Sequence, residues 1–465
     1  MGKTKILLFS FLVASGLLAF SGAEAATLKV GSDMNSCEGV CDYYGATAIQ
    51  QAVNAANSTN NFIEVYGGVW NSMDSNSAIN YYDAIVSIKD KDGNSENPYR
   101  LKCREGYSCK IELPGASSKS FGSIGIAIYG STYWIVDGFT IINDIRLSES
   151  YGVLLASGSN YSKVQNCEIY STLSIGDSYY QSGIYTSVPY TEIIGNTVHD
   201  LGNCIGIDGG GTSDGTETRP PGTRLGQLVD GNVMYRCDYV FSATRTNKVV
   251  VRNNYLHSAI PDGIRNYEIV TKFRDATDTK VYNNIIECDG DISKCFELHN
   301  HTYGYPKNME VYNNTFLNDG DNETALYQVN SGSMTGGKFK NNIFVGFKEG
   351  IAMGAYVSGY PYEISHNAFD DCDVTVKSGC DICWNSVYDK SGIQLFASGN
   401  KPNPYFSLNS SASAIDAGTS DGLIVPMNDY LGNPRTGTID IGAFEYVSGE
   451  IDTIVPVAPQ GLSVW

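Results

Sequence analysis

The chain has 465 residues and a formal net charge of −19, with 42% hydrophobic and 17% charged residues. A protein this acidic repels polyanions, so the charge excludes nucleic acid as a partner. The hydrophobic content excludes a disordered chain and is sufficient for the core of one elongated domain.

Residues 1–25 have the features of a signal peptide. Lys3 and Lys5 form a charged start, residues 6–20 an apolar stretch, and the Ala-Glu-Ala at 23–25 a small-residue cleavage site. The apolar stretch is shorter than the roughly 20 residues of a membrane-spanning helix. We therefore expect secretion to the extracellular space or the cell surface, with the periplasm as a further destination, and no stable membrane insertion. An uncleaved anchor is the alternative.

The sequence contains 12 Cys, all beyond the signal peptide. An even number of Cys in an exported protein favours disulfides. Close pairs are Cys37/Cys41, Cys103/Cys109, Cys288/Cys295 and Cys380/Cys383, with Cys372 near the last pair. The spacing alone does not decide the connectivity. The CxxC at 380–383 has no second CxxC, so neither a metal site nor a redox function is expected there.

The segment 26–130 precedes the regular part of the chain. Residues 46–56 are apolar at helical spacing, and the FIEVY sequence at 62–66 has the composition of a strand. We expect a short helix followed by the first strands, and we expect the regular pattern to begin near residue 131.

A recurring phrase occupies residues 131–400. Its best copies are VYNNII at 281–286 and VYNNTF at 311–316, which start 30 residues apart. In successive copies the last Asn falls at 166, 196, 232, 254, 284, 314, 342 and 367. A period of about 20 to 40 residues with variable insertions is typical of a solenoid.

Each copy is a short alternating strand, then Asn or Gly, then a second β-rich run. Asn and Gly tolerate left-handed backbone conformations and can turn a corner between strands. Asn residues in adjacent coils can also stack into a ladder of amides. The pattern predicts an all-β, right-handed parallel β-helix of roughly nine to twelve coils.

With these repeats the chain resembles the secreted bacterial right-handed β-helix repeat proteins, which include many polysaccharide lyases and some glycosidases. The resemblance implies that 26–130 holds an N-terminal capping helix and the first coils. Residues 401–446, with AIDAG at 414–418 and DIGAFEY at 440–446, resemble the closing segment of choice-of-anchor Q proteins. We expect 447–465 to be a flexible tail.

One window of the sequence is basic. Residues 219–280 hold ten Lys and Arg against six Asp and Glu, in a chain that is otherwise strongly acidic. A local positive patch suits an acidic polysaccharide. The alternative is a surface on which these charges pair with acids of the coils.

Residues 268–301 resemble the site region of the chondroitinase B and alginate lyase family. Glu268 and Glu297 lie about one coil apart, so they could be neighbours on one sheet, and Lys272 follows the first of them. In that family Glu carboxylates bind Ca²⁺, which suits hard oxygen ligands, and a Lys is the base. The resemblance implies Ca²⁺ ligands at Glu268 and Glu297, to which Asp208 is a candidate addition. It also implies Lys272 as base.

The sequence departs from the family pattern at two positions, and other residues would have to replace the missing catalytic groups. The second Glu of its Glu-x-Glu is absent, and the Arg expected before the His is Leu298. His299 or Arg274 would then assist catalysis. The expected substrate-binding residues carry positive, imidazole or phenol groups, namely Arg245, Arg265, Tyr267, His301 and Tyr303.

The leading functional hypothesis is a monomeric lyase that cleaves an acidic, uronate-containing polysaccharide by β-elimination. The alternative is a non-catalytic adhesin that binds glycans through the same surface, and a structural component of the cell envelope is a third. A lyase needs a base beside a group that neutralises a carboxylate, whereas an adhesin needs only aromatic side chains and loops. Lys272, with Glu268 and Glu297 close by in sequence, favours the lyase.

Overall fold

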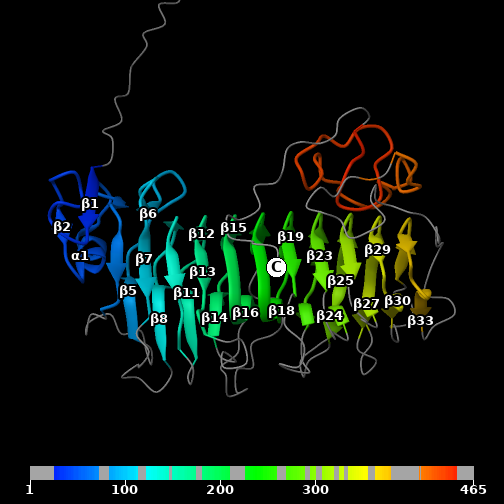
Figure 1. Cartoon of the computed structure of the whole chain (residues 1–465), viewed down its shortest axis with the longest axis horizontal. Helices are drawn as coiled ribbons and strands as arrows, with labels where there is room; N and C mark the ends of the chain where they lie inside the picture. Colours follow the sequence, from blue (N-terminus) through cyan, green and yellow to red (C-terminus); the bar gives the residue numbers. More distant parts are fainter. Residues whose placement is uncertain are drawn as a thin grey trace, which may run out of the picture.

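The computed structural model describes residues 26–72, 83–113, 122–145, 149–173, 181–209, 226–258, 269–288, 294–299, 306–318, 324–328, 334–353, 362–378, 408 and 410–447. Short parallel strands stack coil upon coil along the long axis of the molecule (Figure 1). The predicted all-β parallel β-helix is confirmed.

The strands of each coil lie on three faces, which we call A, B and C. Face A is a sheet of 13 strands. In spatial order these are β2 (Tyr43–Tyr44), β1 (Thr27–Gly31), β3 (Phe62–Val65), β6 (Tyr99–Cys103), β9 (Trp134–Asp137), β12 (Lys163–Gln165), β15 (Glu192–Ile194), β17 (Leu228–Asp230), β19 (Val250–Arg252), β22 (Lys280–Tyr282), β25 (Lys307–Tyr312), β28 (Thr335–Lys340) and β31 (Glu363–Ser365).

Face B follows face A in every coil. Its strands are β4 (Gly68–Trp70), β7 (Cys109–Glu112), β10 (Thr140–Ile142), β13 (Glu168–Tyr170), β20 (Tyr255–His257), β23 (Ile285–Cys288), β26 (Thr315–Asn318), β29 (Ile343–Val345) and β32 (Ala368–Asp370). Two long strands, β16 (Thr197–Asp208) and β18 (Val233–Thr244), continue from face B into face C.

Face C completes the coil. Its remaining strands are β5 (Asp83–Lys89), β8 (Ser123–Tyr129), β11 (Ser150–Leu155), β14 (Gln181–Thr186), β21 (Ile269–Arg274), β24 (Lys294–His299), β27 (Thr324–Gln328), β30 (Glu349–Met353) and β33 (Val374–Ser378). Because neighbouring strands are parallel and in register, each side chain lies next to its counterpart one coil away.

The corner between faces A and B has the same backbone geometry in most coils. Its first residue has a left-handed backbone, as at Gly195 (φ 63°), Asn253 (φ 54°) and Asn283 (φ 54°). Asn and Gly occupy most of these corners because they adopt this conformation at low cost. Asn166 (φ 53°) also occupies this first position, so its assignment to the stacked set was wrong by one residue, and Cys167 aligns with Asn196 instead.

The second residue of the corner forms the predicted amide ladder. Each side-chain Nδ2 donates to the Oδ1 of the next coil at 2.9–3.1 Å. The ladder runs through Asn196, Asn232, Asn254, Asn284, Asn314, Asn342 and Asn367, all at most 1% exposed. Each Nδ2 also donates to a backbone carbonyl, such as that of Val251 for Asn284 (3.0 Å). The ladder therefore satisfies buried polar groups that would otherwise be costly.

The core fills the space between the faces with aliphatic and aromatic side chains, among them Trp134, Phe273, Phe296 and Phe316. Helix α1 (Ala48–Ala55) lies at the N-terminal end, where it buries Ile49, Ala52 and Val53 against the first coil (Figure 1). This is the expected capping helix, and it covers the apolar end of the solenoid. Among the described residues no helix is long and apolar enough to cross a membrane.

Four disulfides occur among the described residues. Three join close pairs noted in the sequence, Cys37–Cys41, Cys103–Cys109 and Cys288–Cys295. The fourth, Cys204–Cys237, joins β16 to β18 across 33 residues, one coil apart. This pair was not predicted, because its members become neighbours only through the coil register. Cys380 and Cys383 lie outside the described residues.

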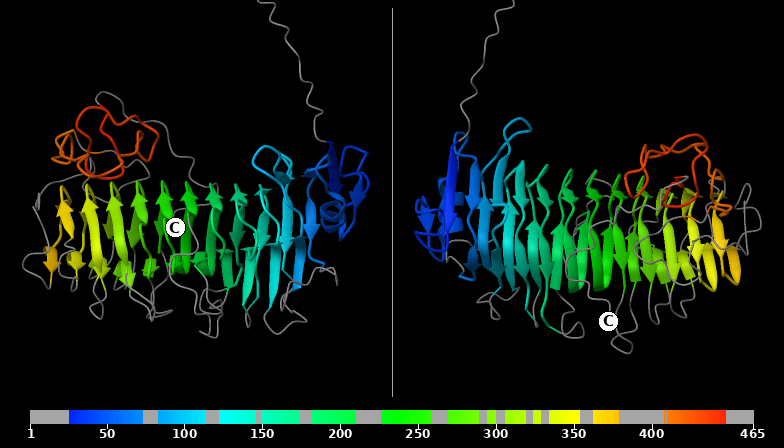
Figure 2. Two further views of the ribbon diagram at one scale, coloured as in Figure 1. Left: turned by 180° about the vertical axis from the view of Figure 1, so that it is seen from behind. Right: turned by 45° about the horizontal axis from the view of Figure 1, so that its top comes forward.

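The segment 410–447 folds back along the side of the solenoid, over the corner between faces A and B (Figures 1 and 2). Its Ala414, Ile441 and Phe444 pack on Ile285 and Ile343 of face B. Buried Arg435 pairs with Glu445 (3.0 Å) and donates to the Asn283 side chain (3.1 Å). The left-handed Asn corners thus also provide the docking surface for the C-terminal segment.

Three stacked rings connect neighbouring coils on face B. The His199 imidazole lies between Tyr170 and Tyr235, with ring centroids at 4.9 and 4.6 Å and interplanar angles of 3° and 6°. Its Nδ1 is 2.5 Å from Asp200 Oδ2, and its Nε2 is 3.8 Å from Glu168. Burial opposes protonation of His199, but hydrogen bonds and charges of the two carboxylates outweigh it and raise the pKa of the ring above 6.5.

We expect Asn284→Ala to lower the free energy of unfolding by about 2 kcal/mol, because the buried backbone N–H of Asn254 loses Asn284 Oδ1 as its acceptor and the Val251 carbonyl loses Asn284 Nδ2 as a donor. Equilibrium urea denaturation measures the change. The matched control is Asn166→Gly, which keeps a left-handed corner outside the ladder and should cost less than about 0.5 kcal/mol. Equal losses for the two variants would contradict a specific role for the ladder.

We expect the stability contributed by His199 to depend on pH. Its raised pKa means that the charged ring stabilises the fold below the ordinary value of 6.5, and this contribution disappears as pH rises through the folded pKa. The pKa values of Asp200 and Glu168 are lowered, so their contribution disappears in acid. In thermal unfolding, His199→Gln should therefore lose most stability near pH 5 to 6, roughly, and least above about pH 8. A pH-independent loss would contradict this assignment.

Candidate functional site

The outward side chains of face C form two rows in the middle of the solenoid. One row contains Ser242, Lys272, Glu297 and Tyr327, each one coil from the next. The second row contains Asp208, Thr244, Arg274 and His299. Between these rows, Phe273 and Leu298 point inward and are 0% exposed.

The register brings together four of the predicted site residues. Lys272 and Arg274 lie two residues apart on β21, and Glu297 and His299 lie opposite them on β24. Alternate residues of a strand point to the same side, and neighbouring strands are about 4.8 Å apart. The four side chains therefore form a two-by-two group on one surface, which we call the face C cluster.

Lys272 and Glu297 form a buried ion pair within the cluster. Their side chains are 10% and 4% exposed, and Lys272 Nζ is 3.3 Å from Glu297 Oε1. Lys294 Nζ approaches the other Glu297 oxygen at 3.8 Å and lies 4.1 Å from the ring centroid of Tyr327. Glu297 thus lies between two ammonium groups. The register makes Lys272 the neighbour of Glu297, whereas Glu268, the neighbour that the sequence predicted, lies outside the described residues.

The environment lowers the pKa of Lys272 below its ordinary 10.5. Burial is the largest cause, because an ammonium group loses hydration inside the protein. The charge of Glu297 partly offsets this effect, while the charges of Arg274 and Lys294 lower the pKa further. A larger fraction of Lys272 is therefore neutral, and able to accept a proton, than of an ordinary lysine at the same pH.

Arg274 differs from the other basic side chains of face C. It is half-buried, and within the part of the chain that the structure describes it forms no ion pair. Its Nε is buried without a hydrogen-bond partner among those residues. A guanidinium in this condition can bind a carboxylate through two parallel hydrogen bonds.

Asp208 and Arg245, predicted as metal ligand and substrate-binding residue, contact each other. Both carboxylate oxygens of Asp208 are 2.8 Å from the same terminal nitrogen of Arg245. The Tyr185 hydroxyl donates to Asp208 Oδ2 at 3.3 Å. These contacts neutralise Arg245 and occupy the oxygens that a metal ion would need.

The described side chains do not form a Ca²⁺ site. Glu297 and Asp208 are each paired with cationic groups, and no group of three or more metal-ligating side chains occurs among the residues described. The third predicted ligand, Glu268, lies outside them. So do the predicted substrate-binding residues Arg265, Tyr267, His301 and Tyr303.

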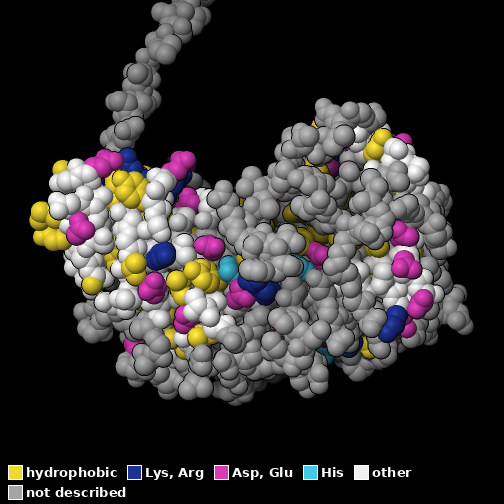
Figure 3. All heavy atoms as spheres, in the orientation of Figure 1, with side chains coloured by type: hydrophobic (Ala, Val, Ile, Leu, Met, Phe, Trp, Pro, Cys, Tyr) yellow, Lys and Arg dark blue, Asp and Glu magenta, His cyan; other side chains and the backbone are white. Residues whose placement is uncertain are grey.

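Most of the described basic side chains of the 219–280 window have acidic partners one coil away. Arg236 pairs with Asp200 (2.6 Å), Arg245 with Asp208 (2.8 Å), Arg252 with Asp230 (2.7 Å) and Lys280 with Glu310 (3.2 Å). On the molecular face of Figure 3, basic side chains likewise lie beside acidic ones. The described part of the window thus follows the ion-paired alternative rather than the free positive patch. Among its described basic side chains, the exposed Lys248 and the half-buried Arg274 form no ion pair.

Sequence reasoning missed Lys294 and Tyr327. Lys294 lies three residues before Glu297, and residues at this spacing are not expected to face the same side of a strand. Tyr327 lies next to Glu297 only in the following coil. The one available signal was the ladder step of 30 residues between Asn284 and Asn314, which also separates Glu297 from Tyr327.

No family model and no curated protein matches the chain. Solved structures match it over most of its length. Pectate lyase Pel9A has a TM-score of 0.56 and 12% identity, covering 91% of this chain and 97% of its own. XylC in complex with xylose has a TM-score of 0.51 and 9% identity, covering 91% and 98%.

An alginate lyase from Paenibacillus sp. covers 77% of this chain and 99% of its own, with 13% identity and a TM-score of 0.47. At identities this low the similarity shows the fold alone. The chain is therefore a parallel β-helix protein that resembles polysaccharide lyases in its architecture.

Proposed function

We propose that the protein is a lyase that cleaves a uronate-containing polysaccharide by β-elimination at the face C cluster. One observation carries the proposal: a buried lysine with a lowered pKa, Lys272, lies two residues from Arg274, a half-buried guanidinium without an ion pair among the described residues. Base and carboxylate-neutralising group thus project from one strand, which is the arrangement that elimination requires.

The reaction begins with the uronate carboxylate. The proton on the carbon next to this group is too weakly acidic to be removed until the negative charge is neutralised. Arg274 supplies that neutralisation by a bidentate contact. Neutral Lys272 then accepts the proton through the lone pair of its amine. The electron pair of the broken carbon–hydrogen bond forms a carbon–carbon double bond, and the bond to the glycosidic oxygen breaks.

The leaving oxygen must receive a proton. His299, next to Arg274 on the neighbouring strand, is the proposed donor. Glu297 is a positioning residue, because its ion pair holds the Lys272 side chain toward the surface of the cluster. Arg245, neutralised by Asp208, retains a binding role only through its remaining donors.

The non-catalytic alternative is favoured by a different observation. Most of the described basic side chains of the 219–280 window form ion pairs with acids of neighbouring coils, as a passive structural surface requires. A glycan-binding adhesin would then use the same surface without chemistry. Export, which either function needs, is supported by the four disulfides, because they form in oxidising compartments.

The direct test offers purified protein alginate, pectate, chondroitin and bacterial exopolysaccharides and follows the ultraviolet absorbance of the new conjugated double bond. We expect turnover of one of them and a loss of about 100-fold or more in Lys272→Gln. The matched control is Lys163→Gln, which removes an ion pair between coils on face A (Lys163–Glu192, 2.6 Å) and should keep full activity. Binding without turnover by the native protein would instead support the adhesin.

Two further variants test the base through the pH dependence of kcat/KM. Since Glu297 raises and Arg274 lowers the pKa of Lys272, the changes should act in opposite directions. Glu297→Gln should move the rise in activity to lower pH, and Arg274→Gln should move it to higher pH while also weakening substrate binding. Shifts in the same direction, or none, would show that another group is the base.

A further inference from the structure

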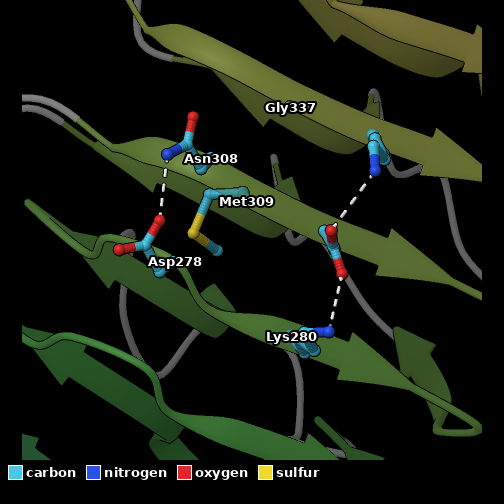
Figure 4. A pocket seen from close by; sticks show the side chains of 7 residues that line it. Asp278, Lys280, Asn308, Met309 and Gly337 are labelled. Atoms are coloured by element: carbon cyan, nitrogen blue, oxygen red, sulfur yellow. Dashed lines mark hydrogen bonds and ion pairs between the residues drawn. The ribbon is translucent and has the colours of Figure 1, made fainter. Parts of the chain in front are cut away.

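We propose that a cavity on face A is a second binding site, which takes a single neutral sugar ring. The cavity has a volume of about 370 Å³ and lies over β22, β25 and β28 (Figure 4). Asp278, Lys280, Asn308, Met309, Glu310, Gly337 and Lys338 line it. The inference goes beyond the proposed catalytic function and does not depend on it.

Polar pairs lie on two sides of the cavity. On one side Glu310 lies between two ammonium groups, with Lys280 at 3.2 Å and Lys338 at 3.5 Å. On the other side Asn308 Nδ2 donates to Asp278 Oδ1 at 2.9 Å. Figure 4 shows Met309 between these pairs. The side chains of Lys280, Glu310 and Lys338 are only 21–30% exposed, so their positions are restricted by the surrounding protein, whereas Asp278 and Asn308 are exposed at the rim.

Backbone geometry shapes the rim of the cavity. Gly337 has φ 149°, a conformation that L side chains rarely adopt, so a side chain at this position would be strained. Asp278 (φ 48°) and Asn308 (φ 51°) both occupy left-handed turns of successive coils, which hold them next to each other at the rim. Lys338 also donates to the carbonyl of Gly422 in the C-terminal segment, which fixes its direction.

The charges of the lining identify the ligand class. Two ammonium groups and two carboxylates cancel, so the cavity has no net attraction for an ion. An anion would meet Glu310 and Asp278, and a metal cation would meet both lysines. A hydroxyl group suits the lining, because it can donate to a carboxylate and accept from an ammonium or amide group at the same time.

The size points to one ring. Small-molecule sites span roughly 300–1,000 Å³, and this cavity lies at the lower end of that range. It also lies on the coils that carry the face C cluster, since Lys280 follows Arg274 after the turn at 275–279. A glycan held here would remain tethered near that cluster, which would raise its local concentration there.

The test is a calorimetric titration of the full chain with the methyl glycosides of glucose, galactose, mannose and xylose, and with galacturonate as a charged comparison. We expect binding of at least one neutral glycoside and weaker binding of galacturonate. The double variant Asp278→Asn/Glu310→Gln keeps the side-chain shapes and removes both carboxylate acceptors, so affinity should fall at least about tenfold.

Glu192→Gln is the matched control, because Glu192 occupies the same outward row of face A and pairs with Lys163 outside the cavity. It should bind like the native protein. Lys272→Gln should also bind normally, which separates failure of this site from failure of the catalytic proposal. Absence of binding by all four glycosides, equal binding by the double variant, or stronger binding of galacturonate would overturn the proposal.

Discussion

Registered stacking of one coil on the next determines where the side chains of the described strands lie. Backbone hydrogen bonds set neighbouring strands about 4.8 Å apart, so an outward residue meets its counterpart in the next coil. The amide ladder from Asn196 to Asn367 holds this alignment on one corner, because each buried amide has its partner only when the coils are in register. Surface chemistry therefore forms in rows that run across coils.

These rows explain the electrostatics of the molecule. A basic residue in one coil usually meets an acid in the next, as in Arg252–Asp230 and Lys280–Glu310. Such pairs neutralise most of the positive window that the sequence suggests. Function then depends on the places where the pairing is incomplete. On face C, Arg274 forms no ion pair among the described residues. On face A, Glu310 differs from the simple pairs because it contacts two lysines, Lys280 and Lys338.

Much of the fold follows from the sequence because stacking leaves a periodic signature. The Asn positions and the helix near residue 50 could be predicted from local patterns, and the close Cys pairs could be recognised although their connectivity stayed open. Asn166 was misplaced by one residue because Asn suits both positions of the corner, one for its backbone and the other for its amide.

The candidate site was harder to predict, since it depends on register. Loops of different length precede each strand of face C, so a step between ladder residues does not fix the step between site residues. Glu297 consequently meets Lys272, and Cys204 meets Cys237. Residue types and approximate location could be read from the sequence, whereas the partners of Asp208, Arg245 and Glu297 required coordinates.

The account depends most on whether the face C cluster performs elimination. The most direct measurement is mass spectrometry of a defined uronate oligosaccharide after incubation with the protein. Elimination adds no water, so the account predicts two fragments whose masses sum to that of the intact oligosaccharide, one of them carrying the double bond. Fragments that together contain one additional water molecule would show hydrolysis and would contradict the assignment of Lys272 and Arg274.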